Sequence, residues 1–189
     1  RFKSHTSQFR ADLDAALKGA SFVTTQIRVG QLAARIQDEK IPLRYGVLGQ
    51  ETTGPGGFMK AQRTIPVLLD LCKKMERLCP DAWLINFTNP AGIVTEALAK
   101  HSPVKSIGIC SGANSMMRDV AKAYSVDRDA VDARFIGLNH LIFADRIKVQ
   151  GQDRTDDFIE KLAQGVGRHN LKNIPDVGLP AEFIRALRL

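Results

Sequence analysis

Short apolar runs of strand length alternate with longer segments of helical periodicity along the first 130 residues. The strand-like runs lie at residues 21–25, 83–85 and 104–110, and they are rich in β-branched or bulky apolar side chains. Apolar residues at spacings of three and four predict helices at residues 31–39, 65–78, 92–100 and 114–124. Strands that alternate with helices in this way are typical of an α/β fold, in which right-handed crossovers connect the strands of a parallel sheet.

The pattern changes after about residue 130. Residues 134–138 and 142–149 read as two consecutive strands with a short connection, which indicates a mixed or antiparallel region. Within the predicted helix 65–78, the expected inward stripe consists of Ile65, Leu68, Leu69, Cys72 and Met75. We therefore expect two domains, residues 1–130 and residues 131–189.

Composition narrows the function classes. The 189 residues are 44% hydrophobic and 25% charged, with a net charge of +7 that suits an anionic ligand. Aromatic residues make up only 6%, and Lys and Arg are spread thinly, which argues against nucleic-acid binding. No apolar run is long enough to span a membrane. Three cysteines are too few for a disulfide framework, and residues 1–5 lead into no signal-peptide pattern, so we predict a cytoplasmic location.

Ligands in parallel α/β sheets bind at the carboxyl ends of the strands, so the residues that follow each strand matter most. Asn86 and Asn89 follow the strand at 83–85, and Asn89 has an alternative role as the N-cap of the next helix, with Pro90 at its first position. Cys110 ends the strand at 104–110, and His140 lies thirty residues on. A lone cysteine or histidine is usually structural, but a thiolate and an imidazole at one sheet edge suit a first-row divalent ion.

Residues 46–57 contain a glycine-rich segment with one acidic residue, Glu51. This segment is either a long surface connection or a loop whose backbone faces a ligand, with Glu51 as its one ionisable side chain. Arg28 and Arg35 lie seven residues apart and share one face if a helix starts early. The planar arginine fork suits a phosphate, although two solvated surface arginines are an equally good interpretation.

Several of these segments together resemble one family, the NAD- and manganese-dependent family 4 glycoside hydrolases. The segments that carry the resemblance are residues 22–30, 45–60, 63–67, 85–95 and 137–140. The segment Gln-Glu-Thr-Thr-Gly-Pro-Gly-Gly at residues 50–57 is similar to the corresponding segment of the 6-phospho-β-glucosidase branch. Ser111 stands where the β-branch usually has Asn and the α-branch Asp, which weighs against α-specificity.

The resemblance implies an α/β fold: a partial Rossmann-like parallel sheet of the lactate and malate dehydrogenase type, followed by the start of an α+β substrate domain. Residues 1–130 would be the C-terminal part of the NAD-binding domain, and residues 131–189 the beginning of the catalytic, substrate and oligomerisation domain. The family's G-x-G turn is not found in this chain, and Tyr45 and Tyr124 do not match its tyrosine base. We therefore expect the chain to be a fragment of a longer protein.

The resemblance also implies a role for each site residue. The ligands of Mn²⁺ would be Cys110 and His140, and the contacts to the substrate would be Arg35 and Asn89. The contacts to the cofactor would be Thr24, Gln26 and Asn86, while Glu51 would raise the basicity of the family's tyrosine base. The implied reaction is hydrolysis of 6-phospho-β-glucosides, for example cellobiose 6-phosphate. It proceeds by NAD-dependent oxidation at C3, elimination, addition of water and re-reduction. The implied partners are a phosphorylated disaccharide or glucoside and further copies of the chain in a dimer or tetramer. The alternatives are a lactate/malate-type 2-hydroxy-acid dehydrogenase and an inactive binding module.

Overall fold

The computed structural model describes residues 12–166 and 180–188. The chain divides into two compact units, the first unit (Arg1–Ile109) and the second unit (Cys110–Leu189). This division lies about twenty residues before the predicted domain boundary at 130/131, because helix α5 (Gly112–Ala123) packs on the strands that follow it. The assignment of cofactor and substrate roles to residues 1–130 and 131–189 remains a prediction.

The first unit contains the predicted parallel sheet. Its strands β1 (Phe22–Thr25), β2 (Trp83–Asn86) and β3 (Lys105–Gly108) pair in the order β1-β2-β3. Thr25 lies opposite Asn86, and Asn86 lies opposite Gly108, so the carboxyl ends of all three strands meet at one edge. The helices of this unit are α1 (Leu13–Leu17), α2 (Gln31–Leu43), α3 (Pro55–Leu78) and α4 (Ala91–His101). The prediction of an α/β fold is thereby confirmed.

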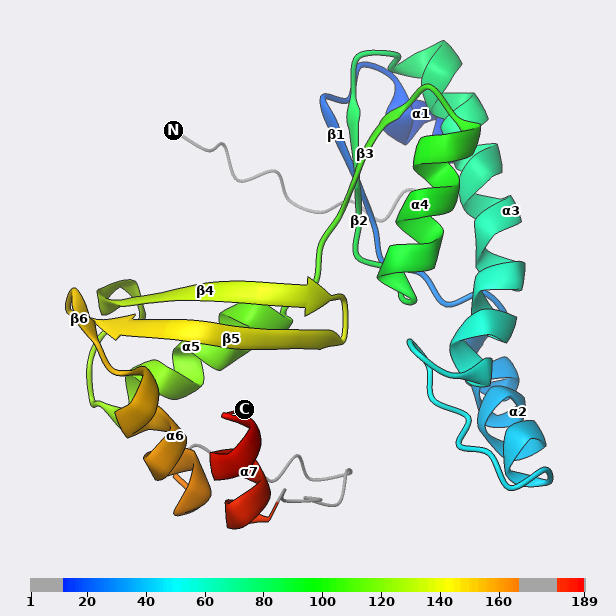
Figure 1. Cartoon of the computed structure of the whole chain (residues 1–189). Helices are drawn as coiled ribbons and strands as arrows, with labels where there is room; N and C mark the ends of the chain where they lie inside the picture. The colour runs from blue at the N-terminus through cyan, green and yellow to red at the C-terminus, as the bar shows by residue number, and fades with distance from the viewer. Residues whose placement is uncertain (1–11, 167–179, 189) are drawn as a thin grey trace. The chain divides into compact units, whose positions relative to one another are not determined.

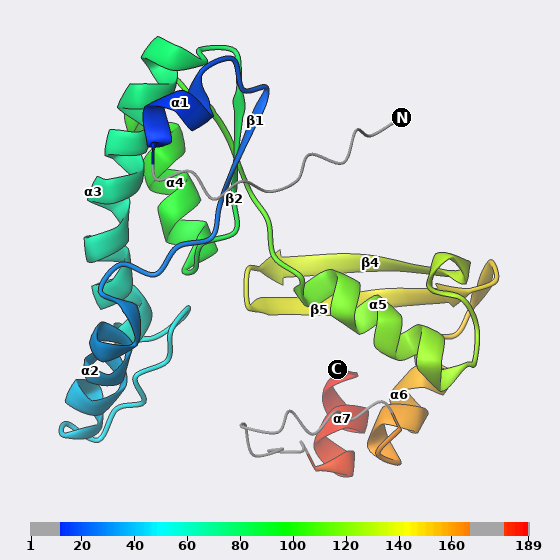
Figure 2. The ribbon, with the colours of Figure 1, turned by 180° about the vertical axis from the view of Figure 1, so that it is seen from behind.

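Helices α3 and α4 lie side by side along one face of this sheet (Figures 1 and 2). The predicted inward stripe of α3 is confirmed, since Leu68, Cys72 and Met75 are at most 1% exposed and pack with Leu84 of β2. Cys79 is the C-cap residue of α3. The opposite face of the sheet carries exposed apolar side chains in the described part of the chain: Phe22, Trp83 and Ile107.

Helix α3 begins at Pro55, ten residues earlier than predicted. Two features explain the difference. Pro55 is favoured in the first turn of a helix because its ring fixes φ and its missing N–H has no partner there. Gly56 and Gly57 are helical and buried because the preceding loop packs directly on them, leaving no room for a side chain. The predicted loop over residues 46–57 therefore ends as the first turn of a helix.

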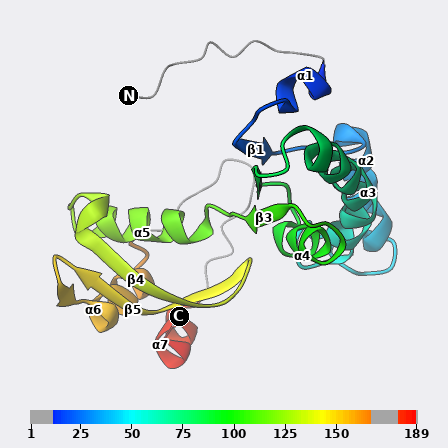
Figure 3. The same ribbon diagram turned by 90° about the horizontal axis from the view of Figure 1, so that it is seen from above.

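The second unit is built around an antiparallel hairpin, as the sequence predicts. Its strands are β4 (Val131–Leu138), β5 (Leu141–Val149) and the short β6 (Gln152–Asp153), paired in the order β4-β5-β6. Helix α5 runs along the hairpin, which Figure 3 shows from above. One turn of 3-10 helix (Arg128–Ala130) joins α5 to β4, and helices α6 (Thr155–Ala163) and α7 (Ala181–Leu187) follow the strands.

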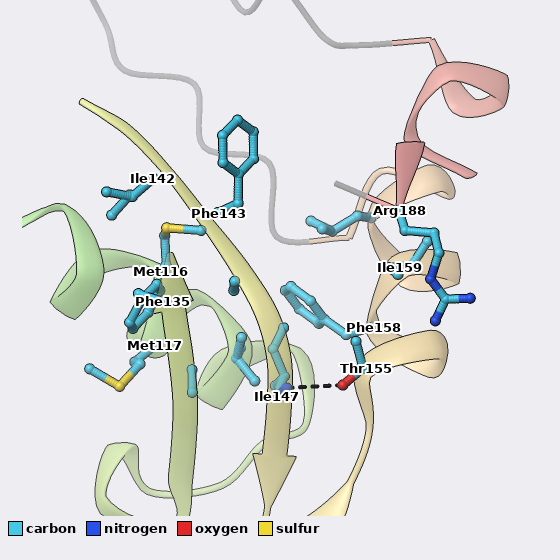
Figure 4. Close-up of a pocket in the computed structure, with 14 residues that line it drawn as sticks. Met116, Met117, Phe135, Ile142, Phe143, Ile147, Thr155, Phe158, Ile159 and Arg188 are labelled. Carbon is cyan, nitrogen blue, oxygen red and sulfur yellow. Dashed lines mark hydrogen bonds between the residues drawn. The ribbon is translucent and has the colours of Figure 1, made fainter. Parts of the chain in front are cut away.

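The core of the second unit is open on one side. Val120, Ile147 and Phe158 are buried in it, yet an apolar pocket of about 210 Å³ remains between α5, the hairpin and α6. Met116, Phe135 and further apolar side chains line this pocket (Figure 4). Polar contacts join the elements around this core, including the bond that the hydroxyl of Tyr124, the C-cap residue of α5, donates to an Asp157 oxygen of α6 at 2.7 Å.

A membrane span would require a long helix of high mean hydropathy. Within the described residues, no helix meets both conditions.

Candidate functional site

The predicted site residues fall into two groups, one in each unit. Six of them belong to the first unit: Thr24, Gln26, Arg35, Glu51, Asn86 and Asn89. Cys110 and His140 belong to the second unit. Each group is built by its own local structure.

Glu51 lies in a tight loop that is fixed by backbone contacts. The side-chain oxygen of Gln50 accepts the N–H groups of Thr52 and Thr53, each at 2.6 Å. The N–H of Gly57 donates to the carbonyl oxygens of Gln50 at 2.9 Å and Gly54 at 3.0 Å. A Cβ at position 57 would lie 1.9 Å from the carbonyl oxygen of Glu51, so only glycine permits this approach. The structure thus favours a packed, structured loop over an open surface connection.

Three cations converge on the Glu51 carboxylate. Arg35 donates to Oε2 at 2.7 Å, Lys60 donates to Oε1, and Arg28 approaches both oxygens at 3.4 Å. The structure therefore brings together Glu51 and Arg35, two of the predicted site residues, and adds Arg28, the second arginine that the sequence pattern singled out.

Sequence reasoning missed Lys60. Lys60, Thr64, Leu68 and Cys72 follow one another at spacings of four, and all are buried, so they form one inward line along α3. A helix predicted from residue 65 onward cannot include the first two. The available signal was a lysine at an inward position of an extended apolar stripe, a place where lysine is rarely found without a partner.

The surrounding cations keep Glu51 ionised. Burial raises the pKa of this carboxyl, but the hydrogen bond and charge of Lys60, together with the charges of Arg28 and Arg35, outweigh it and leave the pKa below the ordinary value. Arg35 also forms an ion pair with Glu39 at 2.5 Å. Three cations and two carboxylates leave an excess of one positive charge, which suits an anionic ligand.

Asn86 anchors the carboxyl ends of β1 and β2. Its Oδ1 accepts the hydroxyl of Thr25 and the N–H of Thr88, both at 3.0 Å. Its Nδ2 donates to the carbonyl oxygen of Thr88 and the hydroxyl of Thr95, both at 3.2 Å. These four bonds use the full capacity of a carboxamide, and the side chain is fully buried.

The dinucleotide contacts predicted at Thr24, Gln26 and Asn86 remain a prediction. Thr24 and Gln26 are exposed at the end of β1, where they are available to a ligand. The side chain of Asn86 is occupied inside the unit, so we expect it to shape this sheet edge from beneath rather than to touch a ligand itself.

Asn89 is not the N-cap of the helix that follows it. Pro90 takes the N-cap position of α4, and no side-chain hydrogen bond caps this helix. The interpretation of Asn89 as a capping residue is therefore wrong. Its half-buried side chain lies at the same sheet edge as Thr24 and Gln26, on the segment that joins β2 to α4.

Cys110 and His140 come together in the second unit. The Cys110 Sγ lies 3.5 Å from the His140 Nε2, and both residues are exposed. Cys110 lies two residues before α5, whereas His140 is in the turn between β4 and β5 with a positive φ of 61°. Together with Asn139 and Met116 they line a cavity of about 490 Å³.

The spacing of this pair fits one shared divalent ion. A thiolate and an imidazole at roughly 2.0–2.3 Å from one first-row metal lie about 3–3.6 Å from each other. Among the described residues, no group of three or more His, Cys, Asp or Glu side chains is placed to hold a metal. Mn²⁺ prefers about six oxygen-rich ligands, so water and a bound ligand would have to supply the rest.

Comparisons with known proteins identify the family. The profile of Family 4 glycosyl hydrolase matches residues 3–126. A probable 6-phospho-β-glucosidase of Bacillus subtilis (strain 168) is 48% identical over 179 residues, which are 94% of this chain and 40% of that protein. A 6-phospho-β-glucosidase of Escherichia coli (strain K12) is 46% identical over 183 residues, with the same coverage.

Solved structures agree. The 6-phospho-β-glucosidase of Thermotoga maritima, solved with manganese, NAD⁺ and glucose-6-phosphate, has a TM-score of 0.83 at 34% identity. The match covers 95% of this chain and 41% of the Thermotoga maritima chain. The malate dehydrogenase of Picrophilus torridus has a TM-score of 0.56 at 15% identity, with coverage of 93% and 45%, and thus shares the fold alone.

This chain spans about 40% of the length of the two curated relatives described above. The malate dehydrogenase likeness confirms the predicted fold type, while the sequence identities distinguish the family from the dehydrogenase alternative. The chain belongs to the family 4 glycosyl hydrolases.

Proposed function

We propose that the protein containing this chain hydrolyses 6-phospho-β-glucosides, with cellobiose 6-phosphate as an example, and that it requires NAD and Mn²⁺. The observation that carries the proposal is the Cys110–His140 pair, whose 3.5 Å spacing fits one divalent ion. The relatives described above support it. Two of them are named 6-phospho-β-glucosidase and a third is named a probable one, and the Thermotoga maritima protein among them was solved with manganese, NAD⁺ and glucose-6-phosphate.

Cys110 and His140 would hold the metal in this proposal, and Thr24 and Gln26 would face the dinucleotide. When bound, NAD⁺ would accept a hydride from C3 of the sugar, and Mn²⁺ would act as a Lewis acid toward the sugar oxygens. The cavity beside Cys110 leaves space for these oxygens and for water. Two protein ligands alone should hold Mn²⁺ weakly, so a bound sugar should strengthen the site.

The residues of the first unit would act on charge and protons. Glu51, kept ionised by its cations, would raise the basicity of the tyrosine that removes the C2 proton. Arg35 and Asn89 would contact the phosphorylated sugar, and the net positive charge of the Glu51 cluster supports an anionic substrate. These roles follow from the family resemblance and are tested by the experiments below.

The β-linkage rests on position 111. Ser111 occupies the N-cap position of α5, directly after Cys110. A serine hydroxyl does not act as an acid at neutral pH, whereas the carboxyl group that the resemblance places here in the α-branch would, in its protonated form, give its proton to the leaving group. We therefore propose a β-glucoside rather than an α-glucoside.

Metal binding provides the first test. We expect weak Mn²⁺ binding to the wild-type chain, strengthened by glucose 6-phosphate and weakened as the pH falls, because the Cys110 thiol must lose its proton. Titration by electron paramagnetic resonance should show that Cys110→Ser and His140→Ala lose this binding. His101→Ala, which changes an exposed histidine at the end of α4, is the matched control. Unchanged binding in both site variants would remove the basis of the proposal.

Activity provides the second test. The protein should hydrolyse 4-nitrophenyl β-glucoside 6-phosphate only with NAD⁺ and Mn²⁺ present, without consuming the NAD⁺. Equal rates on the unphosphorylated β-glucoside would contradict the phosphorylated substrate. Faster hydrolysis of the α-anomer would contradict the role given to Ser111.

The remaining predictions concern assembly and location. We propose a homo-oligomer, a dimer or tetramer, which light scattering coupled to size-exclusion chromatography would measure. We also propose a cytoplasmic location, where phosphorylated sugars are retained, and cell fractionation would test it.

A further inference from the structure

The four charged side chains of the Glu51 cluster differ in burial. The Lys60 side chain is 3% exposed, Glu51 18%, Arg35 25% and Arg28 36%. Lys60 therefore contacts the carboxylate from the protein side, while the two arginines contact it from the side nearer to solvent. The three cations therefore differ in how far solvent reaches them.

The partners of these cations differ as well. Arg35 divides its guanidinium between Glu51 and Glu39, and Arg28 approaches Glu51 only at 3.4 Å. Within the described residues, Glu51 is the carboxylate that pairs with Lys60. The neighbouring Arg63 pairs with Asp38 instead: its two guanidinium NH groups donate to the two carboxylate oxygens of Asp38 at 2.9 and 2.6 Å.

An anionic ligand would meet the arginines first. Arg28 and Arg35 are partly exposed and carry the planar fork that suits a phosphate, so they are able to exchange Glu51 for such a ligand at small cost. Lys60 is buried, and separating it from Glu51 would leave an uncompensated charge inside the protein, which is strongly unfavourable.

We infer that Lys60 is a positioning residue that keeps the Glu51 carboxylate paired and in place while Arg28 and Arg35 turn to the phosphate of the ligand. This inference rests on the proposed function, which supplies the phosphorylated ligand and the role of Glu51. The lowered pKa of Glu51, to which Lys60 contributes more than either arginine, agrees with it. The charged groups that face Glu51 are Arg28 before α2, Arg35 on α2 and Lys60 on α3, with Glu39 bound to Arg35.

The wild-type 189-residue chain allows a first test by nuclear magnetic resonance. Inorganic phosphate is titrated while the side-chain nitrogen signals of Arg28, Arg35 and Lys60 are followed. We expect phosphate to shift both arginine signals and to leave the ammonium signal of Lys60 in place. A Lys60 signal that moves together with the arginines, or arginine signals that do not move at saturating phosphate, would overturn the inference.

The second test follows the titration of the Glu51 carboxyl by carbon-detected spectra, assigned with Glu51→Gln. We expect Lys60→Met to raise the pKa of Glu51, and phosphate to raise it further, since the arginines are then withdrawn. Lys60→Arg should restore most of the wild-type titration, and wild type should keep its lowered pKa in phosphate. Lys73→Met, on the exposed side of α3 where Lys73 pairs with Asp70, is the control and should change nothing.

Two outcomes of the second test would overturn the inference: an unchanged Glu51 titration in Lys60→Met, or a wild-type pKa that rises in phosphate as far as that of the variant. Neither test measures hydrolysis, NAD or Mn²⁺. A protein that fails the activity test but shows these titrations would refute the proposed function and keep the role of Lys60 as the holder of Glu51. A protein that hydrolyses the substrate but does not show these titrations would refute the positioning role of Lys60 and leave the proposed function standing.

Discussion

The two candidate sites differ in how far the protein itself satisfies their polar groups. Glu51 in the first unit is held by three cations inside a tight loop, and the carboxamide of Asn86 has all its hydrogen bonds within the unit. Cys110 and His140 in the second unit are exposed and contact each other across 3.5 Å. The first group is assembled before any ligand binds, whereas the second has coordination capacity left over. Preassembly suits the control of charge, and free capacity suits the capture of a ligand.

The hydrophobic cores show the same contrast. Leu68, Met75, Leu84 and Leu98 of the first unit are at most 1% exposed. Ile147 and Phe158 of the second unit are buried too, but they line a pocket of about 210 Å³, which Figure 4 shows. A closed core resists any change in volume, while an open one has room for added atoms. The following predictions test these two contrasts, from the largest expected effect to the smallest.

Loss of the Glu51 charge should separate the two sites functionally. We expect Glu51→Gln to lower turnover by about 10²–10⁴, the usual contribution of proton-transfer catalysis, and to leave Mn²⁺ binding by Cys110 and His140 unchanged. Turnover measured across the pH range, together with a Mn²⁺ titration, checks both parts. Wild-type turnover at every pH would reduce Glu51 to an anchor of its loop.

Truncation of the closed core should be costly. Leu84→Ala removes a fully buried side chain from β2 and should lower the free energy of unfolding by about 2–5 kcal/mol. Leu141→Ala, at a position that is 57% exposed, should stay within about 0.5 kcal/mol of wild type. Urea denaturation measures both, and hydrogen exchange should place the loss in the first unit. Equal loss of protection in both units would show that they unfold as one.

The same substitution should have opposite signs in the two cores. Ala82→Val adds two methyl groups where the side chain is 1% exposed and should destabilise by about 1–3 kcal/mol. Ala133→Val adds them beside the pocket of the second unit and should stabilise by about 0.5–2 kcal/mol. Thermal unfolding of the two variants measures both changes in stability. Changes of the same sign would contradict the contrast between the two cores.

The smallest effect concerns a polar contact of the second unit. Tyr124→Phe removes the hydrogen bond that joins α5 to Asp157 near the start of α6 and should cost about 1 kcal/mol. Burial and the Asp157 carboxylate raise the pKa of Tyr124, so this hydroxyl stays protonated as a donor. Tyr45→Phe, at a position that is 80% exposed, is the control. Identical denaturation midpoints for all three proteins would show that the bond contributes nothing.

Much of the fold was predictable because it depends on local periodicity. The strands β1, β2 and β3, the helices α4 and α5 and the hairpin of β4 and β5 all lie where alternation or a spacing of three and four places them. The burial of Leu68, Cys72 and Met75 follows from the same pattern. The start of α3 could not be predicted from periodicity. Gly56 and Gly57 are poor helix formers, and glycine is required at both positions because the preceding loop packs directly on them.

The candidate site was predictable only in part. Residue types and strand ends indicated Glu51, Arg35, Cys110 and His140, and the family resemblance gave each a role. The sequence did not reveal Lys60, whose importance lies in its burial against Glu51, nor the internal hydrogen bonds of Asn86.

The sequence by itself thus determined the order of strands and helices, the apolar faces and the kinds of chemistry available. The tertiary structure decided which charges meet, which polar groups are satisfied and which remain open to a ligand. The physical reason is range: periodicity arises between residues a few positions apart, whereas Thr25 and Asn86 meet across 61 positions and Cys110 and His140 across 30. Such contacts are fixed by the packing of whole elements, and that packing sets the distances and burial on which electrostatic strength depends.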